Sequence, residues 1–229
     1  AGFQDSGVSA NNRLIERHAI ATGYFWTSYD FAGNRDRQSL FEFPLGPGDA
    51  EFDFSHDGGE TIFSLPNGFQ GYYLNAADGT RLDQGPTAIV RDQSRKDLAV
   101  TNGISCIGCH NLGIRKKTDA IRTHVLDSRS FPKRVRDDVE ALYPTKEEMD
   151  EIMERDAEKF AAAMRAAGLD PNLSYNGIEM TTVLAEQYDD DLDITLAAAE
   201  FDLSVEEFIE NIQSAGDGEA ARLGRRLEQ

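Results

Sequence analysis

Hydrophobic and polar residues alternate in short runs over the first hundred residues of the chain. Aromatic and β-branched residues are interrupted there by Gly, Pro, Asn and Asp, which is typical of strands joined by turns. The clearest strand is predicted over residues 23–31. The apolar runs 61–65 and 70–74 flank the turn signal Pro66-Asn67-Gly68, so they predict a hairpin. We therefore expect a small antiparallel sheet in this part of the chain.

Farther along, the apolar residues take up helical spacing. Thr118 can cap a short helix that runs through Leu126. Thr145 and Glu148 form a capping box in front of a long amphipathic run over residues 147–167. Further helices are expected around residues 180–188, 193–201 and 204–212.

These patterns predict an α+β protein with three consecutive parts. Residues 1–100 form a β-rich segment that packs on the next part, residues 101–144 form a central segment, and residues 145–229 form an all-helical segment. The helical segment is also acidic. Residues 146–229 hold 22 acidic and 7 basic residues, whereas residues 1–145 hold 19 and 16.

The net charge of −18 limits the range of partners. It argues against nucleic acid and anionic membrane surfaces, because both attract Lys and Arg. A basic stretch over residues 115–136 is the local exception. The apolar runs are far shorter than the roughly 20 residues of a membrane span, so we expect a soluble protein. The first residues show no secretory signal, which by itself leaves the compartment open.

Both cysteines of the chain lie in one short string, Cys106-Ile107-Gly108-Cys109-His110. This is C-x-x-C-H, the pattern through which a haem is covalently attached in c-type cytochromes. Residues three apart share one side of a helical turn, so both thiols can bond to the haem vinyl groups while the histidine coordinates the iron. We expect one covalent haem c, with His110 as proximal ligand. The strand aromatics are candidates for its pocket wall or for ordinary sheet core: Phe25, Trp26, Tyr72 and Tyr73.

Two other kinds of site use closely spaced cysteines. A thiol–disulfide redox site favours a continuous helix after C-x-x-C, and Asn111-Leu112-Gly113 interrupts such a helix within a turn. A structural zinc site needs four ligands, and the chain has neither further cysteines nor a pair of closely spaced histidines. Covalent haem attachment is therefore the favoured interpretation.

The second axial ligand of the iron is less well defined. A six-coordinate iron suits electron transfer, whereas an open position can bind small molecules. His56 is the first candidate, because paired glycines and nearby carboxylates can orient its ring, and His124 is the second, followed by His18. The methionines are candidates too, although Met at helical spacing more often fills the core: Met149, Met153, Met164 and Met180.

Several longer strings resemble a little-characterised group of bacterial monohaem c-type cytochrome domains, which carry a long β-rich segment before the haem motif. The strings that carry the resemblance span residues 13–18, 28–31, 44–47, 56–60, 63–72 and 103–110, and residues 196–200 of the helical tail are also similar. The resemblance implies covalent haem and export from the cytoplasm. It implies no particular substrate and no particular distal ligand.

Electron transfer by one haem is therefore the expected function, and we expect an electron-transfer protein rather than a catalyst. Two alternatives stay open: a haem enzyme or sensor with an open distal site for peroxide, O2 or NO, and a haem-bearing subunit of a larger redox complex. The expected partner is a redox protein of opposite charge. Because thioether bonds to haem form outside the cytoplasmic membrane, we expect a periplasmic or secreted protein.

Overall fold

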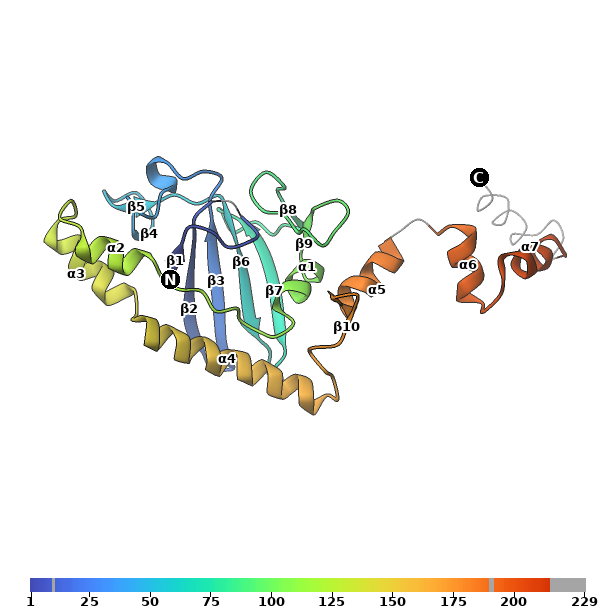
Figure 1. Ribbon diagram of the computed structural model, residues 1–229. Coiled ribbons are helices and arrows are strands. Elements are labelled where there is room, and N and C mark those ends of the chain that lie inside the picture. The colour runs from blue at the N-terminus through green and yellow to red at the C-terminus, as the bar shows by residue number, and fades with distance from the viewer. Residues whose placement is uncertain (10, 190–191, 215–229) are drawn as a thin grey trace. The chain divides into compact units, whose positions relative to one another are not determined.

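The computed structural model describes residues 1–9, 11–189 and 192–214. The chain divides into two compact units, Ala1–Thr182 and Val183–Gln229. Figure 1 shows the sheet of the first unit, with helices beside it and across one end of its strands. Within the described residues, no helix is both long and apolar enough to span a membrane.

Five antiparallel strands form the central sheet of the first unit, in the order β1-β2-β3-β6-β7. They span Gly2–Phe3, Arg13–Ile20, Gly23–Asp30, Gly58–Ser64 and Gln70–Ala76. β6 and β7 pair in register around the turn at Pro66-Asn67-Gly68. The predicted strand over residues 23–31 and the predicted hairpin are therefore confirmed.

Shorter elements connect the long strands. They are the 3-10 helix Asp36–Gln38, the parallel pair β4 (Leu45–Pro47) and β5 (Asp53–Phe54), and the antiparallel pair β8 (Gln84–Gly85) and β9 (Val100–Thr101). These strands have only two or three residues each.

Successive side chains of a strand point to opposite sides, so the sheet has two different faces. On β3 the residues Tyr24, Trp26, Ser28 and Asp30 are buried, and the residues between them are half-buried. Arg13, Ile15 and Arg17 of β2 pair with Asp30, Ser28 and Trp26, so these residues share one face, which we call the inner face. The opposite face carries Leu14 and Tyr29, which pack on a core with the next helices.

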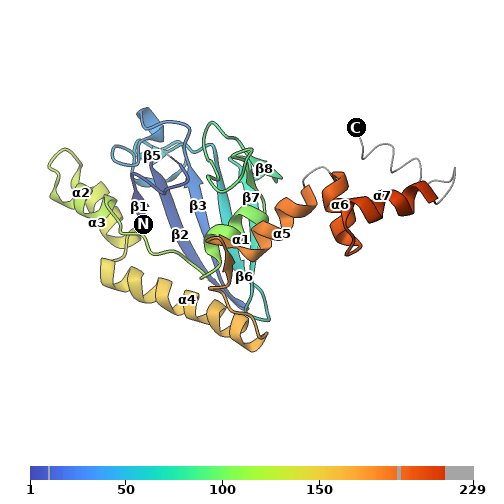
Figure 2. The same cartoon turned by 45° about the vertical axis from the view of Figure 1, so that its right-hand side comes forward.

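Four helices of the first unit follow the sheet: α1 (Ile104–His110), α2 (Ile121–Asp127), α3 (Lys133–Leu142) and α4 (Lys146–Ala166). In both views α1 lies beside the β6–β7 half of the sheet and α4 runs across one end of the strands (Figures 1 and 2). Met149 and Met153 of α4 pack against Trp26 and Ile62 of the inner face. α2 and α3 bury Ile121 and three valines in the core on the other side.

Two helix starts test the capping predictions. Thr145 caps α4 together with Glu148 in a reciprocal capping box, as predicted. Thr118 does not cap α2, which begins at Ile121. Asp119 provides the acceptor for a backbone N–H of the first turn instead, because its Oδ2 accepts a hydrogen bond from the Arg122 backbone N–H at 2.7 Å.

The segment after α4 is helical, with one exception. β10 (Ser174–Tyr175) and β11 (Ile178–Glu179) form a hairpin whose two turn residues, Asn176 and Gly177, both have positive φ. This is the geometry that Asn-Gly favours, and the prediction of an all-helical segment overlooked it. The first unit thus includes the predicted β-rich and central segments, α4 and this hairpin.

The remaining helices agree with the sequence pattern. α5 (Met180–Asp189) crosses the boundary between the units, and α6 (Ile194–Glu200) and α7 (Val205–Ser214) belong to the second unit. α6 and α7 pack through Ala197, Ala198 and Phe208. The last part of the predicted acidic segment, residues 215–229, lies outside the described residues.

Candidate functional site

The cysteine motif forms one short helix, α1, with a glycine at each end. Gly103 precedes the helix with φ 84°, and the Ser105 hydroxyl accepts a hydrogen bond from the Thr101 backbone N–H at 3.0 Å. Gly113 follows the helix with φ 90°, and its N–H donates to the His110 carbonyl. The helix therefore ends directly after His110, as the sequence predicts.

Cys106, Cys109 and His110 line one pocket between α1 and the inner face of the sheet. Its concave space measures about 980 Å³ with the part that is open to solvent included. Most of the accessible surface of the wall is apolar, and its apolar residues are Phe3, Val8, Ile15, Trp26, Ile62, Leu74, Val90, Val100 and Ile114. A large, flat and mostly apolar ligand suits such a wall.

The two thiols are free rather than joined in a disulfide. Burial raises the pKa of both, and the nearby Glu60 carboxylate raises the pKa of Cys106 further. Thiol–disulfide catalysis depends on a lowered thiol pKa. The surroundings of these cysteines therefore disfavour a dithiol redox site.

His110 is held in one ring orientation by the end of its own helix. Its Nδ1 atom lies 3.2 Å from the Gly113 carbonyl oxygen. A carbonyl oxygen only accepts hydrogen bonds, so Nδ1 carries the proton and Nε2 keeps a free lone pair in the neutral ring. This is the arrangement in which a histidine is ready to bind a metal through Nε2.

Three of the four basic residues that line the pocket wall lie outside the sheet: Arg91, Arg115 and Lys117. A haem needs partners for its two propionate groups, an apolar wall for its macrocycle, two thiols and an iron ligand. The pocket offers each of these, so the residues present fit a covalently bound haem. Among the described residues, no cluster of three or more His, Cys, Asp and Glu is placed to bind a metal ion on its own.

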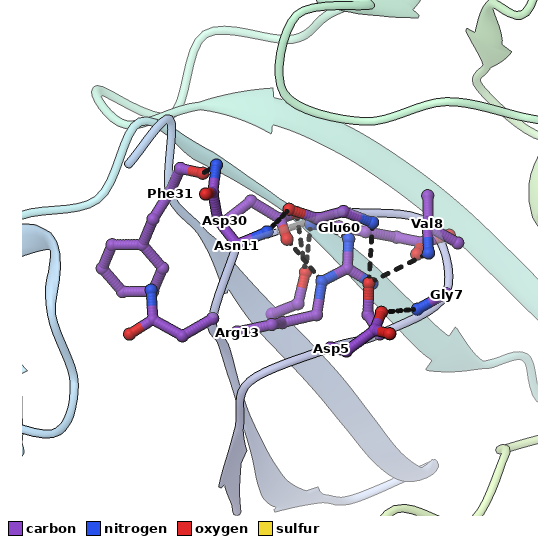
Figure 3. A network of polar contacts seen from close by, with 12 residues as sticks. Asp5, Gly7, Val8, Asn11, Arg13, Asp30, Phe31 and Glu60 are labelled. Carbon is purple, nitrogen blue, oxygen red and sulfur yellow. Dashed lines mark hydrogen bonds and ion pairs between the residues drawn. The ribbon is translucent and has the colours of Figure 1, made fainter. Parts of the chain in front are cut away.

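Charged residues occupy the part of the wall that the inner face contributes. Arg13 and Asp30 lie opposite each other on β2 and β3 and form a two-point ion pair (Figure 3). Glu60 lies on the neighbouring strand β6, and all three residues line the pocket. The sequence patterns indicated no pocket role for any of the three. The sequence did contain a signal for Arg13 and Asp30. Each lies an even number of positions from an apolar residue of its own strand, Arg13 from Ile15 and Asp30 from Trp26, so each is expected on the same face as that residue.

The histidines proposed as distal ligands lie elsewhere. The ring of His56 packs edge-on against Tyr29 at 4.9 Å, and Tyr29 belongs to the face opposite the inner face. His18 stacks on Phe25 at 4.7 Å, also away from the pocket. The His124 Nε2 atom lies 3.0 Å from the Phe41 carbonyl oxygen. None of the three is part of the described pocket wall.

The methionines do not reach the pocket wall either. Met149 and Met153 are buried between α4 and the sheet, where they fill the core. Met164 and Met180 are half-buried on α4 and at the start of α5. The structure therefore brings together Cys106, Cys109 and His110, but it adds no His or Met to the described part of their pocket.

Comparisons with known proteins add no further constraint. Searches against protein-family models, curated proteins and solved structures found no match to this chain.

Proposed function

We propose that this chain is a c-type cytochrome that carries one covalently attached haem. One observation carries the proposal: both thiols and His110 line the same largely apolar pocket, with the Nδ1 atom of His110 bonded to a backbone carbonyl. Histidines that bind metals usually donate their other ring N–H to such an acceptor. The resemblance to bacterial monohaem cytochrome domains supports the same proposal.

Each part of the pocket has a role in this proposal. Cys106 and Cys109 form the thioether bonds, and His110 binds the iron through Nε2. Arg91, Arg115 and Lys117 neutralise the propionates, because charge-assisted hydrogen bonds to carboxylates are the strong ones. The bound haem supplies one-electron redox chemistry.

The proposed role of this haem is to exchange single electrons with a redox partner protein. The net charge of −18 supports a partner with a basic surface, since complementary charge accelerates encounter. Because haem thioether bonds form outside the cytoplasmic membrane, the proposal also includes a periplasmic or secreted location. A role as the haem-bearing subunit of a larger redox complex is compatible with the same site.

The composition of the pocket wall favours a second candidate function, the binding of a small molecule at the iron. In electron-transfer haems the iron commonly has a histidine or methionine ligand on each side of the haem plane. The described wall of this pocket contains His110 but no second histidine and no methionine. An absorption spectrum separates the two functions, because a high-spin iron that binds carbon monoxide contradicts a six-coordinate electron carrier.

Expression together with a haem c maturation system tests the proposal. We expect the mass of the purified chain to increase by one haem, and the haem to stay attached under denaturing conditions. The double variant Cys106→Ala/Cys109→Ala removes both anchors, so we expect no covalent haem. His110→Ala retains the anchors, and we expect attached haem with an altered spectrum.

His18→Ala is the matched control for these variants. His18 contacts Glu16 and Phe25 outside the pocket, so its removal leaves both the mass and the spectrum unchanged. Recovery of the wild-type chain without haem from a functional maturation system would contradict the proposed function.

A further inference from the structure

An ion pair sits in the largely apolar pocket wall that faces α1. The Nη2 atom of Arg13 donates to Asp30 Oδ2 at 2.9 Å, and its Nε donates to Oδ1 (Figure 3). Only 12% of the Arg13 side chain and 6% of the Asp30 side chain are exposed. A buried ion pair often stabilises a fold no better than apolar residues of the same size. Its place in a pocket therefore points to a binding role.

The guanidinium of Arg13 has N–H donors that Asp30 does not use. An arginine carries five N–H groups, and Asp30 accepts from Nε and Nη2 only. The Nη1 atom donates to no described residue, while Arg13 lines the pocket. Asp30 thus holds the guanidinium in place and leaves Nη1 available to a bound molecule.

Glu60 gives the same part of the wall a negative charge. Its backbone N–H donates to the Ser28 hydroxyl, and its carboxylate lies near the Cys106 thiol and raises the pKa of that thiol. A thioether sulfur has no S–H group to offer this carboxylate. After attachment of a haem at Cys106, Glu60 therefore faces the pocket as an acceptor that opposes the positive charge of Arg13.

We propose that the chain leaves one coordination position of the haem iron open to a small external anion and that Arg13 donates a hydrogen bond to that anion. This inference rests on the proposed covalent haem. The described wall supplies no His or Met for that position, and it supplies a buried cation with unused N–H donors. The ligand class is small inorganic anions, because Arg13 offers positively charged N–H donors and most of the accessible wall surface around it is apolar.

Fluoride and carbon monoxide are suitable probes of this site on the purified haem-loaded chain. Fluoride binds ferric haem and accepts hydrogen bonds, so its affinity reports on Arg13. Carbon monoxide binds ferrous haem without a strong need for a donor, so its affinity reports on the open position alone. Both are measured by absorption titration, and the spin state of the ferric protein is measured by electron paramagnetic resonance.

Arg13→Met and Arg17→Met form a matched pair of variants. Both arginines lie on β2 with side chains on the inner face, and both are ion-paired with a buried aspartate. Arg17 does not line the described pocket. We expect Arg13→Met to weaken fluoride binding about 10- to 100-fold, the range for a hydrogen bond to a charged group, and Arg17→Met to leave it unchanged.

Glu60→Gln keeps the test decisive if Arg13→Met does not fold. The substitution removes a negative charge from the pocket and keeps the shape of the side chain, so we expect fluoride to bind more tightly than in the wild type. Carbon monoxide binding stays the same in every variant that carries haem. Weaker or unchanged fluoride binding by Glu60→Gln contradicts the proposed electrostatics.

The outcomes separate the two proposals. Attached haem with a high-spin ferric iron, carbon monoxide binding and the expected effect of Arg13→Met support the open anion site. Attached haem with a low-spin iron that excludes carbon monoxide overturns this inference and leaves the proposed cytochrome intact. Equal fluoride affinity in Arg13→Met and the wild type also overturns it. Absence of haem from the wild-type chain overturns both.

Discussion

Two ion pairs on the inner face of the sheet have different surroundings. Arg13 and Asp30 line the pocket, whereas Arg17 reaches across to α4 and binds Asp156 through Nε at 2.7 Å and Nη2 at 3.1 Å. The indole N–H of Trp26 also donates to Asp156 Oδ2, at 2.8 Å. The second pair therefore attaches α4 to the sheet, and only 3% of the Asp156 side chain is exposed.

Asp156→Ala tests this attachment. The change leaves the guanidinium of Arg17 and the indole of Trp26 buried without their acceptor, so we expect the free energy of unfolding to fall by about 3–5 kcal/mol. Urea denaturation of the purified chain measures this. Glu158→Ala on the same helix is the control, because Glu158 is exposed and pairs with the exposed Arg165, and little change is expected. Equal stability of the two variants would show that Asp156 has no such role.

At the scale of elements, the position of α1 depends on the glycines that flank it. Both have positive φ, a region in which a side chain costs about 1–2 kcal/mol. Their surroundings differ. A Cβ atom on Gly103 would meet no atom within 4 Å, whereas a Cβ on Gly113 would lie 3.0 Å from the Cα of Ala157 on α4. Gly113 therefore sets how closely the end of α1 approaches α4.

Gly113→Ala and Gly103→Ala separate backbone strain from this close contact. We expect both to lower the free energy of unfolding, and Gly113→Ala to lower it more, because α4 must also move. Gly113→Ala also displaces the carbonyl that accepts from His110 Nδ1, so the haem-loaded variant changes its reduction potential, while Gly103→Ala changes it less. A smaller loss of stability in Gly113→Ala than in Gly103→Ala contradicts this explanation. Chemical denaturation and a redox titration provide the two measurements.

At the scale of the whole molecule, the candidate site belongs to one unit. Every residue of the pocket wall lies between Phe3 and Lys117, and the first compact unit extends to Thr182. The second unit has its own small core around Phe208. Folding of the site is therefore expected to be independent of the second unit.

A chain that ends at Asp189 tests this independence. It retains α5 complete and lacks the helices α6 and α7. We expect the shortened chain to incorporate haem and to show the same absorption spectrum and the same midpoint of thermal unfolding for the haem-bearing unit. Loss of haem incorporation, or a clearly lower unfolding midpoint, would mean that the second unit contributes to the site. Absorption spectroscopy during heating reports both properties.

The sequence predicted those features that depend on neighbours in the chain. The hairpin around Asn67, the capping box at Thr145 and the end of α1 after His110 all depend on contacts within a few residues. For the same reason the spacing of Cys106, Cys109 and His110 predicted that they lie on one helical turn. The hairpin at Asn176 and the role of Asp119 are also local and had readable signals in the sequence, but neither was among the predicted features.

The tertiary structure alone decided what surrounds that motif. Arg13 and Asp30 meet because the register of β2 and β3 pairs them, although 17 positions separate them in the chain. Strand alternation places Tyr29, and the His56 ring that packs on it, on the face opposite the pocket. Spacing along the chain specifies which residues share a helical turn. Which side chains share a pocket depends on strand register and sheet face, and these are decided by packing between distant segments.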